Sequence, residues 1–200
     1  MGRSPDMIVV VLHLGVTLWV IAPFLYFMTA GAKIFTAPEL RDGGAQLGQL
    51  SFVASMMCVV CLGVFQSVVW YQVLCGATLA LCSLMLYEWT RRTVIDRHFY
   101  TGLGGEVPAA VCDAGSYQFI RHPFYLSYMV AFLSAVVAFP SLPTALVSIA
   151  CIGLFVYMAI DDERVLLRSE LAADYQTWLS VKFWPIRDRF SAPNRPFREI

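Results

Sequence analysis

Long apolar runs constrain the fold of this chain more than any other feature of its sequence. A helix needs about 20 mainly apolar residues to cross the hydrocarbon core of a bilayer. Only 14% of the residues are charged, whereas soluble domains carry about 25%. The sequence therefore predicts an all-α integral membrane bundle of five transmembrane helices. Their approximate ranges are 7–30, 50–65, 68–89, 124–139 and 143–160.

The basic residues predict the orientation of this bundle. With five spans and the N-terminus outside, every lysine and arginine except Arg3 falls on the inner side. Loops on the cytoplasmic side of membrane proteins are enriched in lysine and arginine. We therefore expect a multi-pass protein with a cytoplasmic C-terminus. The net charge is zero, and the absence of a long basic block argues against nucleic acid as a partner.

Two parts of the chain are expected to differ in role. Residues 1–90 form three N-terminal transmembrane helices, and residues 91–200 form a catalytic half with a cytoplasmic loop, a transmembrane helical hairpin and a C-terminal tail. From Asp161 to Phe183, apolar residues recur every three or four positions. This spacing predicts a C-terminal amphipathic helix that lies in the membrane interface.

The cysteines predict neither a disulfide framework nor a metal site. Most of them lie inside the apolar runs, where thiols pack as small hydrophobic groups. Cys58 and Cys61 have C-x-x-C spacing, but no second ligand pair accompanies them. Cys112 differs because it lies in a polar loop.

Two polar clusters are expected to meet at the inner side of the bundle. Arg121-His122-Pro123 precedes the fourth apolar segment, and Asp161-Asp162-Glu163-Arg164 follows the fifth. Because a very short turn joins these two segments, the clusters should be neighbours in space. Charged residues and tyrosines at helix ends also serve as plain interface anchors. Three consecutive acidic residues at the end of a span nevertheless favour a functional site.

The sequence around the first cluster resembles a known signature. Residues 115–125, GSYQFIRHPFY, resemble the G-x-Y-x-x-x-R-H-P-x-Y motif of integral-membrane methyltransferases. The isoprenylcysteine carboxyl methyltransferases are the best-known members, and phospholipid N-methyltransferases are related. Asp162-Glu163, followed by Leu166 and Tyr175, looks like the second signature of that family. The resemblance covers about residues 109–185.

The resemblance implies a transferase that uses S-adenosyl-L-methionine. The cofactor would lie between the last two spans and the inner loops, and a lipophilic or lipid-anchored acceptor would approach through the membrane. Glu163 would bind the methionyl amino group, and the backbone of residues 109–112 would contact the cofactor. The implied cofactor-binding residues are Ala109, Ala110, Val111, Cys112, Tyr117, His122, Pro123, Phe124, Tyr125 and Glu163.

Departures from the family pattern leave the methyl acceptor open. Ser127 stands where the signature usually has glycine, and Ala159 stands where eukaryotic members have an arginine that meets the acceptor. Arg164 and Arg168 are the candidates to orient the acceptor in its place. An isoprenylcysteine-type carboxylate, a phospholipid amine and a thiol all stay open as acceptors.

Two functions of other classes are compatible with the same composition. Some membrane sterol reductases share this C-terminal architecture and bind NADPH there. A non-catalytic membrane scaffold could retain the same residues for packing. The short chain and the lack of recognisable organelle signals favour the inner membrane of a bacterium.

Overall fold

The computed structural model describes residues 7–34, 69–96, 112, 114–168 and 172–173. Every element assigned within these ranges is a helix, so the predicted all-α fold is confirmed for this part of the chain. The elements are α1 (Met7–Ile34), α3 (Trp70–Asp96), the 3-10 helix η1 (Gly115–Gln118), α4 (Pro123–Ala138) and α5 (Leu142–Arg168).

Four of the five predicted apolar segments largely coincide with these helices. The second, at residues 50–65, lies outside the described residues. Two helices, α3 and α5, are long and apolar enough to cross a membrane, whereas α1 and α4 contain shorter apolar stretches. Only 28% of the apolar window in α3 and in α5 is buried, whereas the core helix of a soluble protein is mostly buried. These two helices support a membrane location.

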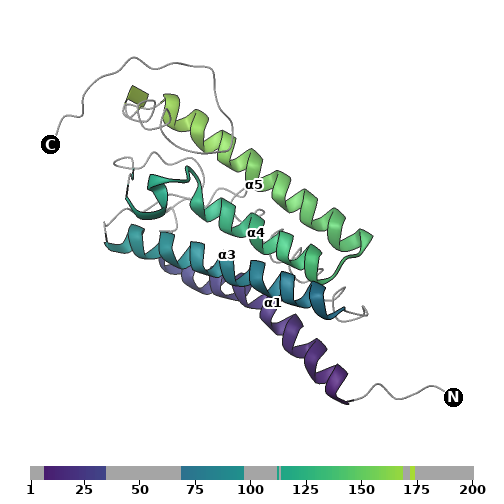
Figure 1. Ribbon diagram of the computed structural model, residues 1–200. Coiled ribbons are helices and arrows are strands. Elements are labelled where there is room, and N and C mark those ends of the chain that lie inside the picture. Colours follow the sequence, from purple (N-terminus) through teal and green to yellow (C-terminus); the bar gives the residue numbers. More distant parts are fainter. Residues whose placement is uncertain (1–6, 35–68, 97–111, 113, 169–171, 174–200) are drawn as a thin grey trace.

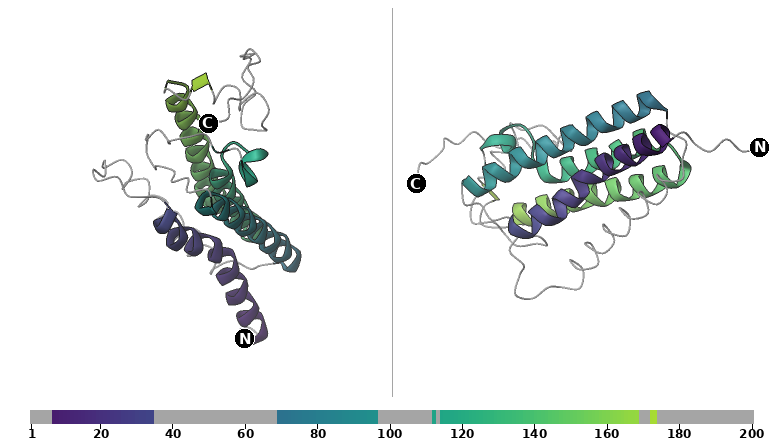
Figure 2. Two further views of the ribbon diagram at one scale, coloured as in Figure 1. Left: turned by 90° about the vertical axis from the view of Figure 1, so that its left-hand side faces the viewer. Right: turned by 90° about the horizontal axis from the view of Figure 1, so that it is seen from below.

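The helices are arranged so that α4 lies between α3 and α5 (Figure 1). Helix α1 packs against α3 and also touches α4 (Figure 2). The C-terminal ends of α1, α3 and α5 meet the N-terminal end of α4 at one end of the bundle, on the left in Figure 1. We call this end the polar end, because it carries Glu88, Arg121 and Glu163.

Small side chains allow α3 and α4 to approach closely. A Cβ atom added to Gly76 would lie 2.7 Å from Cβ of Ala138 and 3.0 Å from the carbonyl oxygen of Ser134. The hydroxyl of Ser83 donates to the carbonyl oxygen of Ser127 at 2.7 Å. Small residues let helices pack closely in membranes, where lipid tails are as apolar as leucine. The small residues of α3 and α4 that are fully buried include Ala80, Ser83, Ser127, Ala131, Ser134, Ala135 and Ala138.

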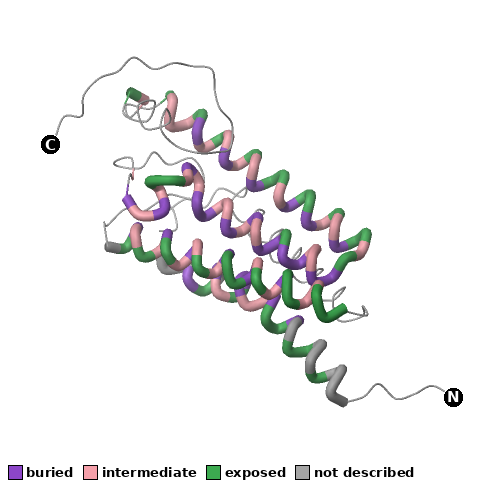
Figure 3. The backbone as a smooth tube through the Cα atoms, viewed as in Figure 1, coloured by how far each residue is buried: buried purple, intermediate pink, exposed green. Residues whose placement is uncertain are grey.

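Helix α5 turns a stripe of small and aromatic residues toward the bundle and exposes its other side (Figure 3). Consecutive members are three or four positions apart, which places them on one face of a helix. The stripe ends with a glutamate, so the side chain of Glu163 points inward like the apolar residues before it. The buried residues of α5 are Thr144, Ser148, Cys151, Phe155, Ala159 and Glu163.

Helices α3 and α5 continue furthest beyond the apolar segments that the sequence predicts. Helix α3 continues beyond Trp89 to Asp96, so Arg91 and Arg92 belong to a helix and not to a loop. Helix α5 continues beyond Ile160 to Arg168. The prediction of a separate interfacial helix that begins at Asp161 is therefore wrong, because residues 161–168 belong to α5. No glycine or proline interrupts residues 154–168. Without such a break, continuing the helix keeps the backbone groups hydrogen-bonded.

Candidate functional site

A tight turn between α4 and α5 brings the two polar clusters together, as the sequence predicts. The side chain of Ser141 accepts a hydrogen bond from the backbone N–H of Thr144 at 3.2 Å, which satisfies one of the free donors at the start of α5. At the other end of α4, Pro123 occupies the first turn, where its missing N–H costs nothing. His122 is the N-cap residue, but its side chain makes no capping hydrogen bond.

The imidazole of His122 instead faces Glu163. Its Nε2 lies 3.2 Å from Oε1 of Glu163, and Nη1 of Arg121 lies 3.5 Å from the same oxygen. An ionised carboxylate only accepts hydrogen bonds, so the imidazole is the donor. The side chains of Arg121 and Glu163 are 7% and 10% exposed. A buried carboxylate is therefore held between two basic groups from the start of α4.

A second contact between the same two helices involves Asp162, the residue before Glu163. The hydroxyl of Tyr125 donates to Oδ2 of Asp162 at 2.7 Å. The ring of Tyr125 also stacks on His122, with 5.7 Å between ring centroids and an interplanar angle of 17°. This stacking fixes the plane of the imidazole that meets Glu163. Asp162 thus contacts Tyr125, whereas Glu163 contacts His122 and Arg121.

Helix η1 carries Tyr117 to the site and rests on the last turns of α3. The hydroxyls of Thr90 and Ser116 are 2.9 Å apart, and Ser116 is fully buried. Burial raises the pKa of Tyr117 well above its ordinary value, and the nearby Cys112 and Asp162 raise it further. The phenol therefore stays protonated at neutral pH.

Gly115 is required where η1 meets α3. Its φ is +55°, a conformation that favours glycine. A Cβ atom there would collide with the hydroxyl of Thr93 and lie 2.8 Å from its Cγ2. Gly115→Ala is therefore expected to lower the unfolding free energy by about 1–3 kcal/mol, measured by thermal unfolding in detergent with tryptophan fluorescence.

Gly15→Ala is the matched control for this prediction. A Cβ atom at Gly15 would have no neighbour within 4 Å, so this variant should unfold no earlier than the wild type. Equal unfolding temperatures for the two variants would contradict the fit of Gly115 against Thr93.

The other predicted site residues have different surroundings. Ala109, Ala110 and Val111 lie outside the described residues, and Cys112 is partly buried. Phe124 packs its ring against Tyr87, with centroids 5.2 Å apart, as part of the core. Arg164 and Arg168 are exposed on α5, and among the described residues neither forms an ion pair with the clusters at the start of α4.

The structure adds residues that the motif comparison does not assign to the site. Arg121 and Asp162 both contact predicted site residues. A separate group forms between α1 and α3, where Tyr26 donates to Glu88. The spacing of Glu88 with Arg91, three positions later, is a signal of an ion pair in the sequence. The contact with Tyr26 has no such signal, because it depends on how two distant helices pair.

Comparison with known proteins adds no relative to this description. No protein-family model, curated protein or solved structure matches the chain. The geometry of the site and the resemblance of its two motifs are therefore the grounds for a function.

Proposed function

We propose that this protein is a membrane methyltransferase that uses S-adenosyl-L-methionine and acts on a lipophilic acceptor. The proposal rests on which oxygen of the Glu163 carboxylate the neighbouring side chains contact. Both basic partners approach its Oε1, and within the described residues Oε2 makes no hydrogen bond or ion pair. A buried carboxylate that is anchored through one oxygen suits a ligand ammonium at the other, by a charge-assisted hydrogen bond.

The neighbouring groups match the remaining charges of this cofactor. When bound, S-adenosyl-L-methionine supplies an electrophilic methyl group carried on a sulfonium. Tyr117 and Tyr125 offer aromatic faces, which attract cations and stack on flat rings. The imidazole of His122 and backbone N–H groups are the candidates to bind the cofactor carboxylate. Glu163 would hold the methionyl ammonium, as the resemblance implies.

The residues of the site would act mainly by positioning and by excluding water. Fixing a nucleophile and a methyl group in line can supply roughly 7–11 kcal/mol of the barrier. A carboxylate or thiolate acceptor arrives ionised and needs no base, whereas an amine acceptor must lose a proton. In that case His122 or Glu163 would accept it. The proposal therefore keeps O-methylation of an isoprenylcysteine-type carboxylate first, with phospholipid N-methylation and thiol S-methylation as alternatives.

The topology forms part of the proposal. Five transmembrane helices with the N-terminus outside would place the polar end, with Glu163, at the cytoplasmic surface of a bacterial inner membrane. The clustering of Arg91, Arg92 and Arg121 at one end of the described helices supports this orientation, because basic residues concentrate on the cytoplasmic side. Arg164 and Arg168 would face the same surface and stay candidates to orient the acceptor.

Calorimetric titration of S-adenosyl-L-methionine into the detergent-purified protein tests the proposal. We expect micromolar binding to the wild type and binding weaker by roughly 10- to 100-fold in Glu163→Gln, since one charge-assisted hydrogen bond contributes about 1.5–3 kcal/mol. The matched control is Asp161→Asn, which neutralises an exposed carboxylate two residues away and should bind like the wild type.

Two results would refute the proposal. One is unchanged binding in a folded Glu163→Gln variant. The other is a folded wild type that fails to bind S-adenosyl-L-methionine, and binding of NADPH by that protein would favour the reductase alternative. Thermal unfolding of each variant before titration separates loss of the site from loss of the fold.

A further inference from the structure

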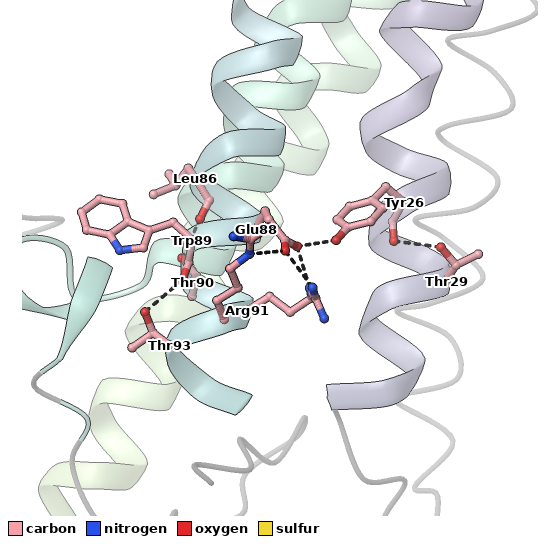
Figure 4. Close-up of polar contacts among 9 residues, drawn as sticks. Tyr26, Thr29, Leu86, Glu88, Trp89, Thr90, Arg91 and Thr93 are labelled. Carbon is pink, nitrogen blue, oxygen red and sulfur yellow. Dashed lines mark hydrogen bonds and ion pairs between the residues drawn. The ribbon is translucent and has the colours of Figure 1, made fainter. Parts of the chain in front are cut away.

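A second polar group, which we call the arginine pair, lies near the C-terminal end of α3 at the polar end, where Glu88 and Arg91 face Tyr26 of α1 (Figure 4). It consists of Arg91 and Arg92, both held by Glu88. Nε and Nη2 of Arg91 lie 2.6 Å and 2.7 Å from the two carboxylate oxygens, and Nε of Arg92 lies 2.7 Å from Oε1. The hydroxyl of Tyr26 in α1 donates to the same carboxylate.

The arginine pair has one positive charge more than Glu88 can neutralise. It also has unused donors, because within the described residues Nη1 and Nη2 of Arg92 make no hydrogen bond. The side chain of Arg92 is 72% exposed, whereas that of Arg91 is 27% exposed. The carboxylate thus holds both guanidinium groups, and the terminal nitrogens of the exposed Arg92 are left to donate to a ligand. A guanidinium presents its donors in a rigid fork that matches phosphate oxygens.

The surroundings of this group are those expected at the level of lipid headgroups. It follows directly on the apolar part of α3, a helix long enough to cross a membrane. Trp89, next to Glu88, is 46% exposed. Tryptophan and tyrosine are enriched where a membrane helix leaves the hydrocarbon core. An exposed tryptophan beside two arginines at the end of a span is therefore typical of a site that contacts lipid headgroups.

We propose that the arginine pair binds the phosphate group of an anionic phospholipid. Arg92 supplies the exposed guanidinium, Arg91 adds a second positive charge, and Glu88 with Tyr26 holds both in position. Binding requires only that phosphate oxygens accept hydrogen bonds from guanidinium groups, and no bond is made or broken. This site is separate from Glu163 and does not depend on the proposed methyl transfer.

The test measures lipid binding to the detergent-purified protein by microscale thermophoresis. The probes are dioctanoyl phosphatidic acid, dioctanoyl phosphatidylcholine and inorganic phosphate. We expect the wild type to prefer phosphatidic acid, and Arg92→Gln to lose about tenfold in affinity for it, the effect of one charge-assisted hydrogen bond. Because Arg92 is exposed, this variant should fold. Arg92→Lys, which keeps the charge without the fork, should lose less.

The control is Asp161→Asn, which changes the net charge by one unit at an exposed position on α5 at the same end of the bundle. Its affinity for phosphatidic acid should change less than twofold. A gain in affinity in Asp161→Asn as large as the loss in Arg92→Gln would show attraction to net charge alone and would overturn the proposal, as would unchanged affinity in Arg92→Gln. Inorganic phosphate that binds as tightly as phosphatidic acid would overturn the assignment to a lipid.

Discussion

Gly76→Ala is expected to lower the stability of the bundle, whereas Gly153→Ala is expected to leave it unchanged or to raise it. Both residues lie in the interior of long helices, where alanine is normally more favourable than glycine by about 1 kcal/mol. At Gly76, however, the new methyl group would lie 2.7 Å from Cβ of Ala138 and 3.0 Å from its backbone nitrogen. Backbone cannot move aside as the end of a side chain can, so α3 and α4 must separate. Overpacking of this kind costs about 1–3 kcal/mol.

Thermal unfolding in one detergent, followed by tryptophan fluorescence, measures both variants against the wild type. Gly153 is the matched control because a Cβ atom there would have no neighbour within 4 Å. The difference between the two variants is the informative quantity, since the gain in helix propensity is common to both. If Gly76→Ala unfolds no earlier than Gly153→Ala, the close contact of α3 with α4 is wrong.

The part of the site that could be predicted from the sequence is the part held by local chain geometry. A short turn after α4 forces the start of α4 and the end of α5 to meet, so the approach of His122 to Glu163 follows from the spacing of two apolar runs. The inward orientation of the Glu163 side chain could also be predicted from the sequence, because Glu163 continues the four-residue spacing of Phe155 and Ala159. No knowledge of other helices is needed for these steps.

Contacts between distant helices could not be predicted in this way. The hydrogen bond from Tyr26 to Glu88 joins residues 62 positions apart, and nothing in the apolar pattern of α1 indicates which helix it meets. The apolar pattern also placed the end of α3 too early, at Trp89 instead of Asp96. Hydropathy marks where the apolar residues stop, but the backbone hydrogen bonds of a helix continue through polar residues such as Arg91.

Glu163→Leu is expected to destabilise the protein strongly, and adding Arg121→Leu is expected to restore much of the loss. The single change removes the carboxylate that faces the buried Arg121 guanidinium, 3.5 Å away. Removing one partner of a buried ion pair costs about 3–5 kcal/mol, whereas replacing both with apolar residues is often neutral or stabilising. The unfolding temperature of Glu163→Leu should therefore lie well below that of the wild type. The double variant should unfold at a higher temperature than Glu163→Leu, and its unfolding temperature can equal or exceed that of the wild type.

The double variant separates the two roles assigned to Glu163. If the carboxylate only balances the charge of Arg121, Arg121→Leu with Glu163→Leu should regain both stability and binding of S-adenosyl-L-methionine. If Glu163 holds the cofactor ammonium, the double variant should be stable in thermal unfolding and still fail to bind in calorimetry. A double variant no more stable than Glu163→Leu would contradict the ion pair itself. Stability regained without binding would mean that this buried carboxylate is kept for the ligand, because a pair of leucines satisfies the fold equally well.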